Sequence, residues 1–573
     1  MKKYYLIILS ALLSSTLSFC QVLIPDSLYG VNSIRAFPTS VGESFIKFLL
    51  QQDGLLISAG FDYDINQNDF HIDMIRHSVC GEIDSSFGVN GLSRTTFEQR
   101  NTGYDFTLQP DGKILSVGLQ APSNAGSQQI PYVARFLTNG SPDSTFGTSG
   151  SNSLRFDNTS SGAFYSVYVL PDGRITCIGT CSGNINGGVN APGIMRFLPD
   201  GTLDLSFNGT GILQYSTGLN SSFGKLLGFV LSNGNSIVAG EYNDASVNKH
   251  FFAVAVDSTG NPLTGYGANG LFTDTVILSQ EFAACIQSDE KIILAAQRMP
   301  VTDGMEFIRL LSDGEMDPAF GTGGRSIISI SNMVLRNIKT LSNDRIVVMG
   351  SLGSGLGIAC CVMLNSNGLI DSTFGTNGFL LIDVNNNSGS QFLNDILELP
   401  LNRILAGASD GDFKSRRFSQ TSNVPHITYT HPLLSSTGSG TFQWYRDSVF
   451  VPGAASSTYS PAATGSYTVE ITDDLGCIYM SDPFVITTVG IKENPVNEYA
   501  VSPNPFNDYL HFKPGIFLQD AEIEITEATG KMVYSTHVNA GINPVINTAS
   551  FSKGIYLIHI STSGRDIIQK IVK

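Results

Sequence analysis

The stretch DSTFGTSG, Asp143–Gly150, decides the fold because the chain repeats it. Close copies are DSSFGVNG at 84–91 and DSTFGTNG at 371–378, while LTGYGANG at 263–270 is more distant. We call this segment the joint octapeptide. Its aromatic residue recurs at intervals of 54 to 61 residues, and a segment repeated at that spacing indicates a structural repeat. The aromatic residues are Tyr29 (in a diverged copy, DSLYGVNS), Phe87, Phe146, Phe207, Tyr266, Phe320 and Phe374.

Two further patterns keep the same period. A turn followed by an apolar run, as in QPDGKILSVG at 109–118, occurs seven times. A second pattern, as in YVARFLTNG at 132–140, precedes each octapeptide, and its last copy is KSRRFSQ at 414–420. Seven units therefore occupy about 26–420, within a predicted repeat region of 21–420.

Each unit is interpreted as four strands. In the second unit these are 91–97, 104–109, 113–120 and 132–138, rich in apolar and β-branched residues and separated by turn signals. Asp-Gly and Asn-Gly between apolar runs favour hairpins. Seven four-stranded units predict an all-β, seven-bladed β-propeller, with one blade completed by strands from both termini. A linear β-solenoid is the alternative, but its rungs are usually much shorter.

Together the three patterns resemble the delta-60 repeat of secreted and surface bacterial proteins. The resemblance covers about 390 residues. It is specific because three patterns recur in register. It implies a surface-exposed, β-rich repeat domain and no established catalytic activity.

Elementary chemistry gives the joint octapeptide a structural role. Its Asp can cap a turn through an Asx-type hydrogen bond, its aromatic ring can pack against the next blade, and its glycines can take positive φ. A calcium-binding ring of Asp side chains is the alternative. One Asp per copy is too few for an ion that takes about 6–8 oxygens, and the fourth copy has Leu263 instead.

The composition excludes one class of partner. The formal net charge is -16, the pI is about 4.9, and only 14% of residues are charged. Such a surface repels a polyanion, which argues against nucleic-acid binding.

Residues 1–20 are typical of a secretory signal peptide. Lys2 and Lys3 precede the apolar run YYLIILSALL, and cleavage is expected near Cys20–Gln21. A lipoprotein signal ending at Cys20 is the alternative, although Phe19 stands where such signals carry a small residue. No later run reaches 18 consecutive apolar residues, so we expect no transmembrane segment in the mature chain.

The eight cysteines predict neither a zinc site nor a disulfide scaffold. Cys177 and Cys181 would lie about 13 Å apart on an extended strand, too far for a disulfide. We expect small buried side chains, with room for one bridge.

Residues 421–490 resemble the immunoglobulin-like modules of secreted bacterial proteins, which are β-sandwiches. Trp444 stands on the expected central strand, and Tyr467 lies on a later strand before Cys477. An early-strand cysteine is missing, which leaves the usual inter-sheet disulfide open. The resemblance implies a spacer or a weak binding module.

After a linker at 491–500, residues 501–573 resemble the type A C-terminal sorting domain of type IX secretion cargo. PNPF, TGKMVY, GIYLIHI and the terminal KIVK occur in the expected order. The resemblance implies a small β-sandwich recognised by an outer-membrane translocon, usually removed by a sortase-like peptidase. It implies an extracellular or outer-surface location, reached through the periplasm. The residues that carry it are Pro503, Asn504, Pro505, Gly530, Gly554, Tyr556, Lys570 and Lys573.

Known catalytic and cofactor motifs are missing from the sequence. HExxH, P-loop and GxGxxG patterns do not occur and no nucleophile elbow is identified, so no catalytic or cofactor-binding residue is assigned. Asp62, Asp64, Asn66 and Asp73 are spaced as in an EF-hand loop, but Gln67 replaces the required glycine and flanking helices are not expected. The segment is interpreted as a solvated loop, with calcium as the weaker alternative.

These observations favour a secreted, non-enzymatic propeller that binds a glycan, a matrix component or a protein for adhesion or capture. The alternative is a propeller hydrolase or lyase acting on extracellular polysaccharide, and a purely structural role is a third. The units stay within 54 to 61 residues, without the long insertions that build an enzyme pocket, which favours binding.

Overall fold

The computed structural model falls into two compact units, residues 1–460 with 465–485, and 461–464 with 486–573. The signal peptide, Tyr29 and Asn66 lie outside the residues that the structure describes. Those residues are 24–25, 34–36, 44–64, 69–97, 100–121, 129–157, 161–182, 190–219, 223–279, 281–299, 304–330, 333–353, 357–382, 391–399, 403–409, 413–419, 425–487, 501–513, 517, 519–562 and 566–573.

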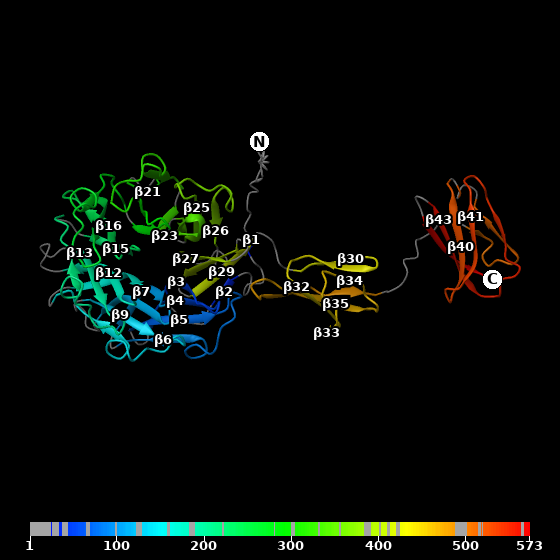
Figure 1. The fold of residues 1–573 in the computed structure, drawn as a ribbon, viewed down its shortest axis with the longest axis horizontal. Helices are drawn as coiled ribbons and strands as arrows, with labels where there is room; N and C mark the ends of the chain where they lie inside the picture. Colours follow the sequence, from blue (N-terminus) through cyan, green and yellow to red (C-terminus); the bar gives the residue numbers. More distant parts are fainter. Residues whose placement is uncertain are drawn as a thin grey trace, which may run out of the picture. The chain divides into compact units, whose positions relative to one another are not determined.

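Six four-stranded antiparallel sheets follow one another along the first unit (Figure 1). Each sheet uses four consecutive strands, as the alternation of apolar runs and turns predicted. A short 3-10 helix, η3 (Ser342–Asp344), interrupts the sixth. The strands are β3 (Ser44–Leu50), β4 (Leu56–Asp64), β5 (Asp69–His77) and β6 (Leu92–Thr95); β7 (Arg100–Leu108), β8 (Ile114–Ala121), β9 (Ile130–Phe136) and β10 (Ser151–Ser153); β11 (Ser161–Val169), β12 (Ile175–Ser182), β13 (Asn190–Phe197) and β14 (Ile212–Gln214); β15 (Phe223–Val230), β16 (Ser236–Asn243), β17 (Lys249–Val256) and β18 (Leu271–Thr273); β19 (Ala283–Ile286), β20 (Ile292–Gln297), β21 (Met305–Leu310) and β22 (Arg325–Ile328); β23 (Met333–Thr340), β24 (Ile346–Leu352), β25 (Ile358–Leu364) and β26 (Phe379–Leu381).

A seventh sheet contains strands from both ends of the repeat region. β27 (Phe392–Leu399), β28 (Arg403–Ser409) and β29 (Phe413–Ser419) pair in sequence, and β1 (Ile24–Pro25) and β2 (Ile34–Ala36) both pair with β29. The prediction that one blade takes strands from both termini is therefore confirmed. The number of sheets equals the number of repeats counted in the sequence.

The first strand of every sheet belongs to a closed inner ring. β3, β7, β11, β15, β19, β23 and β27 each contact the next, and β27 contacts β3. Closed radial packing of four-stranded sheets is the β-propeller architecture. The all-β propeller prediction is thus confirmed.

The predicted start of the four-stranded unit was wrong, because it was placed one strand too early in the chain. The segment 91–97 was expected to open the second unit, but β6 is the outer edge strand of the first sheet, beside β5. The octapeptide lies between the third and fourth strands of one sheet, so the chain crosses to the next sheet only after the fourth.

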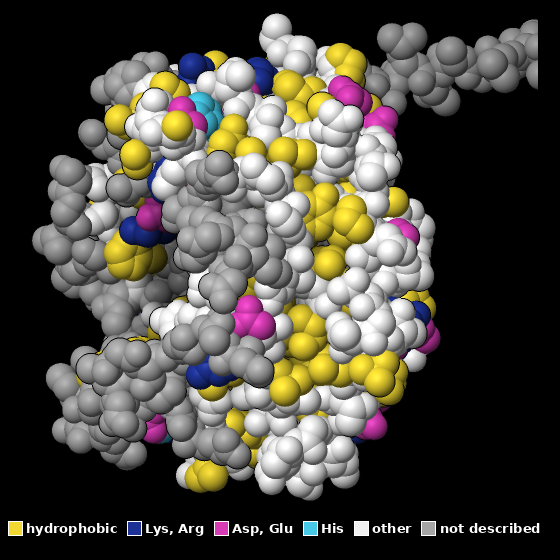
Figure 2. All heavy atoms as spheres, turned by 90° about the vertical axis from the view of Figure 1, so that its left-hand side faces the viewer, with side chains coloured by type: hydrophobic (Ala, Val, Ile, Leu, Met, Phe, Trp, Pro, Cys, Tyr) yellow, Lys and Arg dark blue, Asp and Glu magenta, His cyan; other side chains and the backbone are white. Residues whose placement is uncertain are grey.

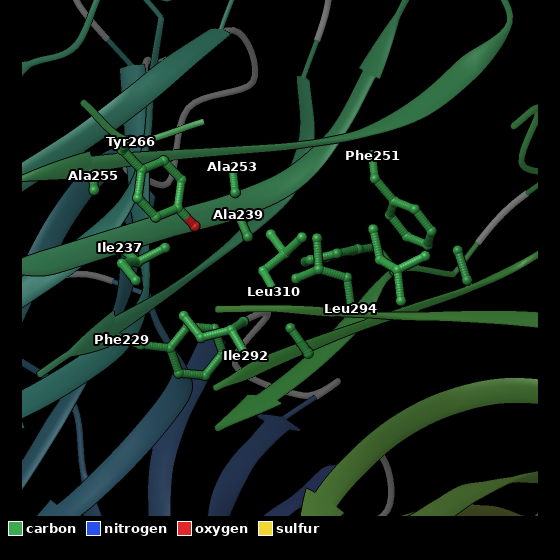
Figure 3. Packing of buried hydrophobic residues seen from close by; sticks show 14 of the residues in the cluster. Phe229, Ile237, Ala239, Phe251, Ala253, Ala255, Tyr266, Ile292, Leu294 and Leu310 are labelled. Atoms are coloured by element: carbon green, nitrogen blue, oxygen red, sulfur yellow. The ribbon is translucent and has the colours of Figure 1, made fainter. Parts of the chain in front are cut away.

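The hydrophobic core lies between neighbouring sheets rather than in one central body. Between the fourth and fifth sheets, Ile237, Ala239 and Phe251 face Ile292 and Leu294, as Figure 3 shows. All five side chains are buried. Alternate residues of each strand point to opposite faces of its sheet. Every sheet of the ring can therefore contribute apolar side chains to the clusters on both of its sides.

Residues 427–486 form what we call the two-sheet module, of which 427–460 and 465–485 belong to the same compact unit as the propeller. Trp444 is fully buried at its centre and donates from Nε1 to the Ser456 carbonyl at 2.8 Å. Cys477 forms a disulfide with Cys80 of the propeller, not with a cysteine inside the module. The strands are β30 (Ile427–Thr430), β31 (Leu433–Ser436) and β34 (Thr458–Tyr459) in one sheet, and β32 (Thr441–Arg446), β33 (Val449–Phe450), β35 (Gly465–Thr472), β36 (Ile478–Met480) and β37 (Phe484–Ile486) in the other.

The second unit contains two facing antiparallel sheets, with Leu510, Ile523 and Ile558 in its core. Its strands are β38 (Val501–Ser502), β39 (Tyr509–Phe512) and β42 (Val545–Asn547), and β40 (Ala521–Glu527), β41 (Met532–Val538), β43 (Ile555–Thr562) and β44 (Asp566–Val572). Throughout the described part of the chain, no helix has the length and apolar character needed to cross a membrane.

Candidate functional site

At four of the steps from one sheet to the next, the joint octapeptide holds an ion pair. Asp143 accepts hydrogen bonds from the backbone N–H and the hydroxyl of Thr145 at 3.1 and 2.6 Å, which is an Asx turn. Its other oxygen pairs with Nε of Arg135 at 2.8 Å. Arg135 also donates to the carbonyl of Pro199, in the next sheet. The same ion pair recurs as Arg76–Asp84, Arg196–Asp204 and Arg309–Asp317.

The aromatic residue of the octapeptide packs on a glycine of the next sheet. The Phe146 ring lies 4.6 Å from the Arg135 guanidinium, and a Cβ added to Gly201 would lie 3.0 Å from that ring. Gly147 donates its N–H to the Asp200 carbonyl at 2.8 Å. Phe374 is buried in a cluster shared by the sixth and seventh sheets. The other ring–glycine pairs are Phe87–Gly140, Phe207–Gly260, Tyr266–Gly314 and Phe320–Gly368.

The fourth copy replaces both members of the ion pair with apolar residues. Ala255 and Leu263 occupy the positions of the arginine and the aspartate, and Leu263 donates its N–H to the Ala255 carbonyl at 2.9 Å, in the register of Asp143 and Arg135. Both pack near Tyr266 in one hydrophobic cluster. A joint therefore tolerates a pair of charges or a pair of apolar groups, which indicates a structural role for the octapeptide.

The EF-hand-like segment forms a β-hairpin between β4 and β5. Asp64 pairs with Asp69 across the hairpin. Arg94 contacts the carboxylates of both Asp62 and Asp73, at 3.1 and 2.5 Å. Among the residues that the structure describes, no group of three or more His, Cys, Asp or Glu side chains could hold a metal ion.

Side chains on the inner strands form a second set of contacts between neighbouring sheets. The Asp105 carboxylate on β7 accepts the Val167 N–H of β11 at 3.0 Å and pairs with Lys47 of β3 at 2.9 Å. On β27, the Asp395 carboxylate accepts the Phe48 N–H of β3 at 2.9 Å. Side chains of the inner strands thus bridge the first sheet to the second, the second to the third, and the last to the first.

Four side chains on inner strands, and one just before such a strand, make up what we call the channel ring: Tyr104 on β7, Tyr165 on β11, Lys225 on β15, Glu281 before β19 and Arg336 on β23. The rings of Tyr104 and Tyr165 are stacked, with centroids 5.1 Å apart. Arg336 forms an ion pair with Glu281 at 3.0 Å. Lys225 is exposed to solvent, and both tyrosines are half-buried. An aromatic platform therefore adjoins one acidic and two basic groups.

The surroundings change the acidity of these groups. Burial and the neighbouring Tyr165 raise the pKa of Tyr104 to about 12, so it stays neutral at physiological pH. Although the Lys225 side chain has exposed surface, the surrounding protein partly desolvates its ammonium group and lowers its pKa, while Glu281 and Asp105 act against that effect. Glu281 has φ of 64°, which is rare for a residue with a side chain. Perturbed groups and backbone strain gather at functional sites more often than elsewhere.

Charge is otherwise sparse on the propeller. Figure 2 shows one face on which basic and acidic side chains are scattered among uncharged polar and apolar ones. The channel ring differs from that surface because it combines aromatic, basic and acidic groups on neighbouring strands. Sequence reasoning missed it, since its residues come from five different repeats and share no motif.

The residues expected to mark a sorting signal lie together in the second unit. Asn504 donates from Nδ2 to the Lys570 carbonyl at 2.9 Å and accepts the Val572 N–H at 2.9 Å. Gly554 and Lys573 exchange backbone hydrogen bonds at 3.0 and 3.1 Å. Tyr556 is buried, Gly530 forms a turn at φ of 85°, and cis peptide bonds precede Pro503 and Pro505.

Family comparisons match parts of both the propeller and the second unit. Residues 500–573 match the family described as a secretion system C-terminal sorting domain. Residues 109–146 and 170–207 match a β-propeller domain family of unknown function. No curated protein matched the chain.

Solved structures resemble the chain only remotely. Drosophila semaphorin 1a, extracellular domains 1–2, is 9% identical with a TM-score of 0.38, over 67% of this chain and 87% of that one. The propeller domain of the trilobed protease from Pyrococcus furiosus is 9% identical with a TM-score of 0.34, over 66% and 97%. A polysaccharide lyase, described as a PL25 ulvan lyase, is 10% identical with a TM-score of 0.29, over 78% and 95%.

The first unit carries repeats that close into a propeller, and the second ends the chain with a matched sorting domain. The chain is therefore a β-propeller protein with a secretion system C-terminal sorting domain, exported by type IX secretion to the cell surface or the extracellular space.

Proposed function

We propose that the protein is a non-enzymatic binding protein, and that the channel ring receives a glycan with single acidic groups outside the cell. The net charge of -16 disfavours a long polyanion, whereas Lys225 and Arg336 supply positive charge locally. The supporting observation is the ring itself. The stacked Tyr104 and Tyr165 offer an apolar face of the kind on which a sugar ring packs. Lys225 and Arg336 offer donors for a carboxylate or a sulfate ester. Glycan binding suits a protein whose sorting domain directs it out of the cell.

A polysaccharide-active enzyme is the second candidate. The occurrence of an acidic group, Glu281, and a basic group, Lys225, at neighbouring inner strands favours it, because acid–base catalysis needs such groups in reach of one substrate. Partners expected in either case are the type IX translocon and its sortase-like peptidase, followed by the extracellular ligand.

The test is a glycan array combined with a degradation screen, both with the purified secreted protein. Binding to acidic glycans without release of product supports the proposal. Lys225→Met should weaken that binding at least fivefold, whereas Lys113→Met, on an outer hairpin turn, should leave it unchanged. Product release without a tightly bound glycan would refute the proposal and favour the enzyme.

A further inference from the structure

The seam between the last and the first propeller sheets differs from the other seams. Elsewhere the chain runs directly from one sheet into the next. Here β27–β29 meet β3–β6, which stand more than 300 residues earlier, and the strands added from the N-terminus are short: β1 has 2 residues and β2 has 3. Apart from those strands, closure depends on a hydrophobic cluster that joins Phe48 and Leu56 of the first sheet to Leu399 and Leu405 of the seventh. It also depends on side-chain-to-backbone contacts such as the one between Asp395 and Phe48.

Arg417 is the joint arginine of this seam. It precedes Phe418 in the seventh repeat as Arg135 precedes Phe136 in the second. It donates to the Val79 carbonyl of the first sheet's turn at 3.0 Å, as Arg76 donates to the Thr138 carbonyl one sheet further on. The seam therefore uses the same arginine-to-carbonyl contact as the ordinary joints.

The two-sheet module contacts both sides of this seam. On the first sheet, its Cys477 is bonded to Cys80, the residue next to Val79. On the seventh sheet, Arg417 donates to the Tyr479 hydroxyl at 2.8 Å, and Arg403 pairs with Asp473 at 3.1 Å. One turn of the module, 473–479, thus holds the first sheet by a covalent bond and the seventh by two arginines.

The contact is buried and internally connected. Arg403 and Arg417 are 3% and 1% exposed, and Asp473 is 6% exposed. The Tyr479 hydroxyl donates to Asp473 at 2.8 Å, so Arg417, through its hydrogen bond to Tyr479, and Arg403, through its ion pair, are linked by Asp473. Buried charged networks of this kind are costly to break on one side only. Separation of the two sheets would require the module to leave one of them.

We propose that the two-sheet module is a clasp that holds the propeller ring closed across this seam, and that the Cys80–Cys477 disulfide makes the closure redox-sensitive. Disulfides form and persist in oxidising compartments, which lie on the route of an exported protein. Reduction breaks the S–S bond, adds two electrons and two protons from a dithiol reductant, and leaves two thiols. The seventh sheet then keeps the module while the first sheet is released from it.

The test is hydrogen exchange on the full secreted chain, with and without dithiothreitol. Reduction should raise the exchange rate at least tenfold at Phe48 and in 414–419, on the two sides of the seam. Gly147, which reports on the seam between the second and third sheets, should change less than twofold. Cys80→Ser/Cys477→Ser should show the fast seam without reductant and should not respond to it.

Two outcomes would overturn the proposal. One is equal exchange at the seam in the reduced and oxidised chains, since the disulfide would then contribute nothing to closure. The other is a uniform rise at all seams, which would indicate global destabilisation. If the double variant does not fold, reduction of the folded natural chain still decides the matter. Arg417→Met provides a second approach, with faster exchange expected at this seam and Arg135→Met as the matched control at another.

Discussion

The fourth repeat lacks the arginine–aspartate ion pair, and it suggests how to measure the contribution of that pair to the stability of the propeller. Asp143→Leu removes one member of a buried ion pair, and Arg135→Ala/Asp143→Leu reproduces the natural Ala255 and Leu263. The single change leaves a guanidinium that is 7% exposed without its carboxylate. The double change leaves no buried charge at the joint.

The two variants should differ clearly in stability. Removal of one partner of a buried ion pair costs about 3–5 kcal/mol, whereas its replacement by apolar groups is often neutral or stabilising. The double variant also loses the contact of Arg135 with Phe146 and its hydrogen bond to Pro199, which we place at about 1–2 kcal/mol together. A coupling free energy of about 2 kcal/mol or more is therefore expected.

Calorimetry and hydrogen exchange can measure this difference. At about 2.1 cal/mol/K per residue, a propeller of roughly 400 residues unfolds with an entropy near 0.8 kcal/mol/K, so 4 kcal/mol corresponds to about 5 °C in Tm. The Gly147 amide, bonded to the Asp200 carbonyl, reports on this joint alone. Arg196→Ala/Asp204→Leu is the matched control at the next joint. Equal losses for the single and double variants would refute the idea that the two charges act as a unit.

Three further results are expected. Hydrogen bonds from a serine and an arginine outweigh the effect of burial and hold the pKa of Asp204 at about 2, below its unfolded value of about 3.9. Its stabilisation is therefore complete above pH 4 and is lost as the pH falls towards 2, and Tm measured between pH 6 and pH 2.5 checks this. Gly201→Ala should cost about 1–3 kcal/mol through its clash with Phe146, and more than Gly209→Ala, where nothing lies within 4 Å of the added Cβ; thermal unfolding of both variants decides. Deletion of 503–573 should leave the protein in the periplasm, and its appearance in the culture medium would contradict the sorting role.

The sequence predicted the propeller because one contact is repeated many times. Phe146 recurs as Phe87, Phe207 and Phe320, since each packs on the same glycine of the next sheet. The joint arginine could also have been found. It stands eight residues before the Asp in most copies, and both residues are lost together in the fourth. The error in the phase of the unit arose because the octapeptide was taken as a boundary between sheets, whereas it lies inside one.

The channel ring and the disulfide could not be predicted in this way. Tyr104, Lys225 and Arg336 occupy similar places on their strands but have different chemistry, so a search for recurring motifs passes over them. Cys80 and Cys477 are 397 residues apart, and neither belongs to a spacing pattern. Only the closure of the ring and the position of the two-sheet module bring these groups together.

The hydrogen bonds between Gly554 and Lys573 hold the residue after β44 against the residue before β43. The Lys573 Nζ also donates to the carbonyls of Thr548 and Ala549. We therefore expect the export address to be a folded surface rather than a linear tail. A reporter protein should be exported only when the whole second unit is fused to it, and an affinity tag placed after Lys573 should interfere with recognition although it removes no residue.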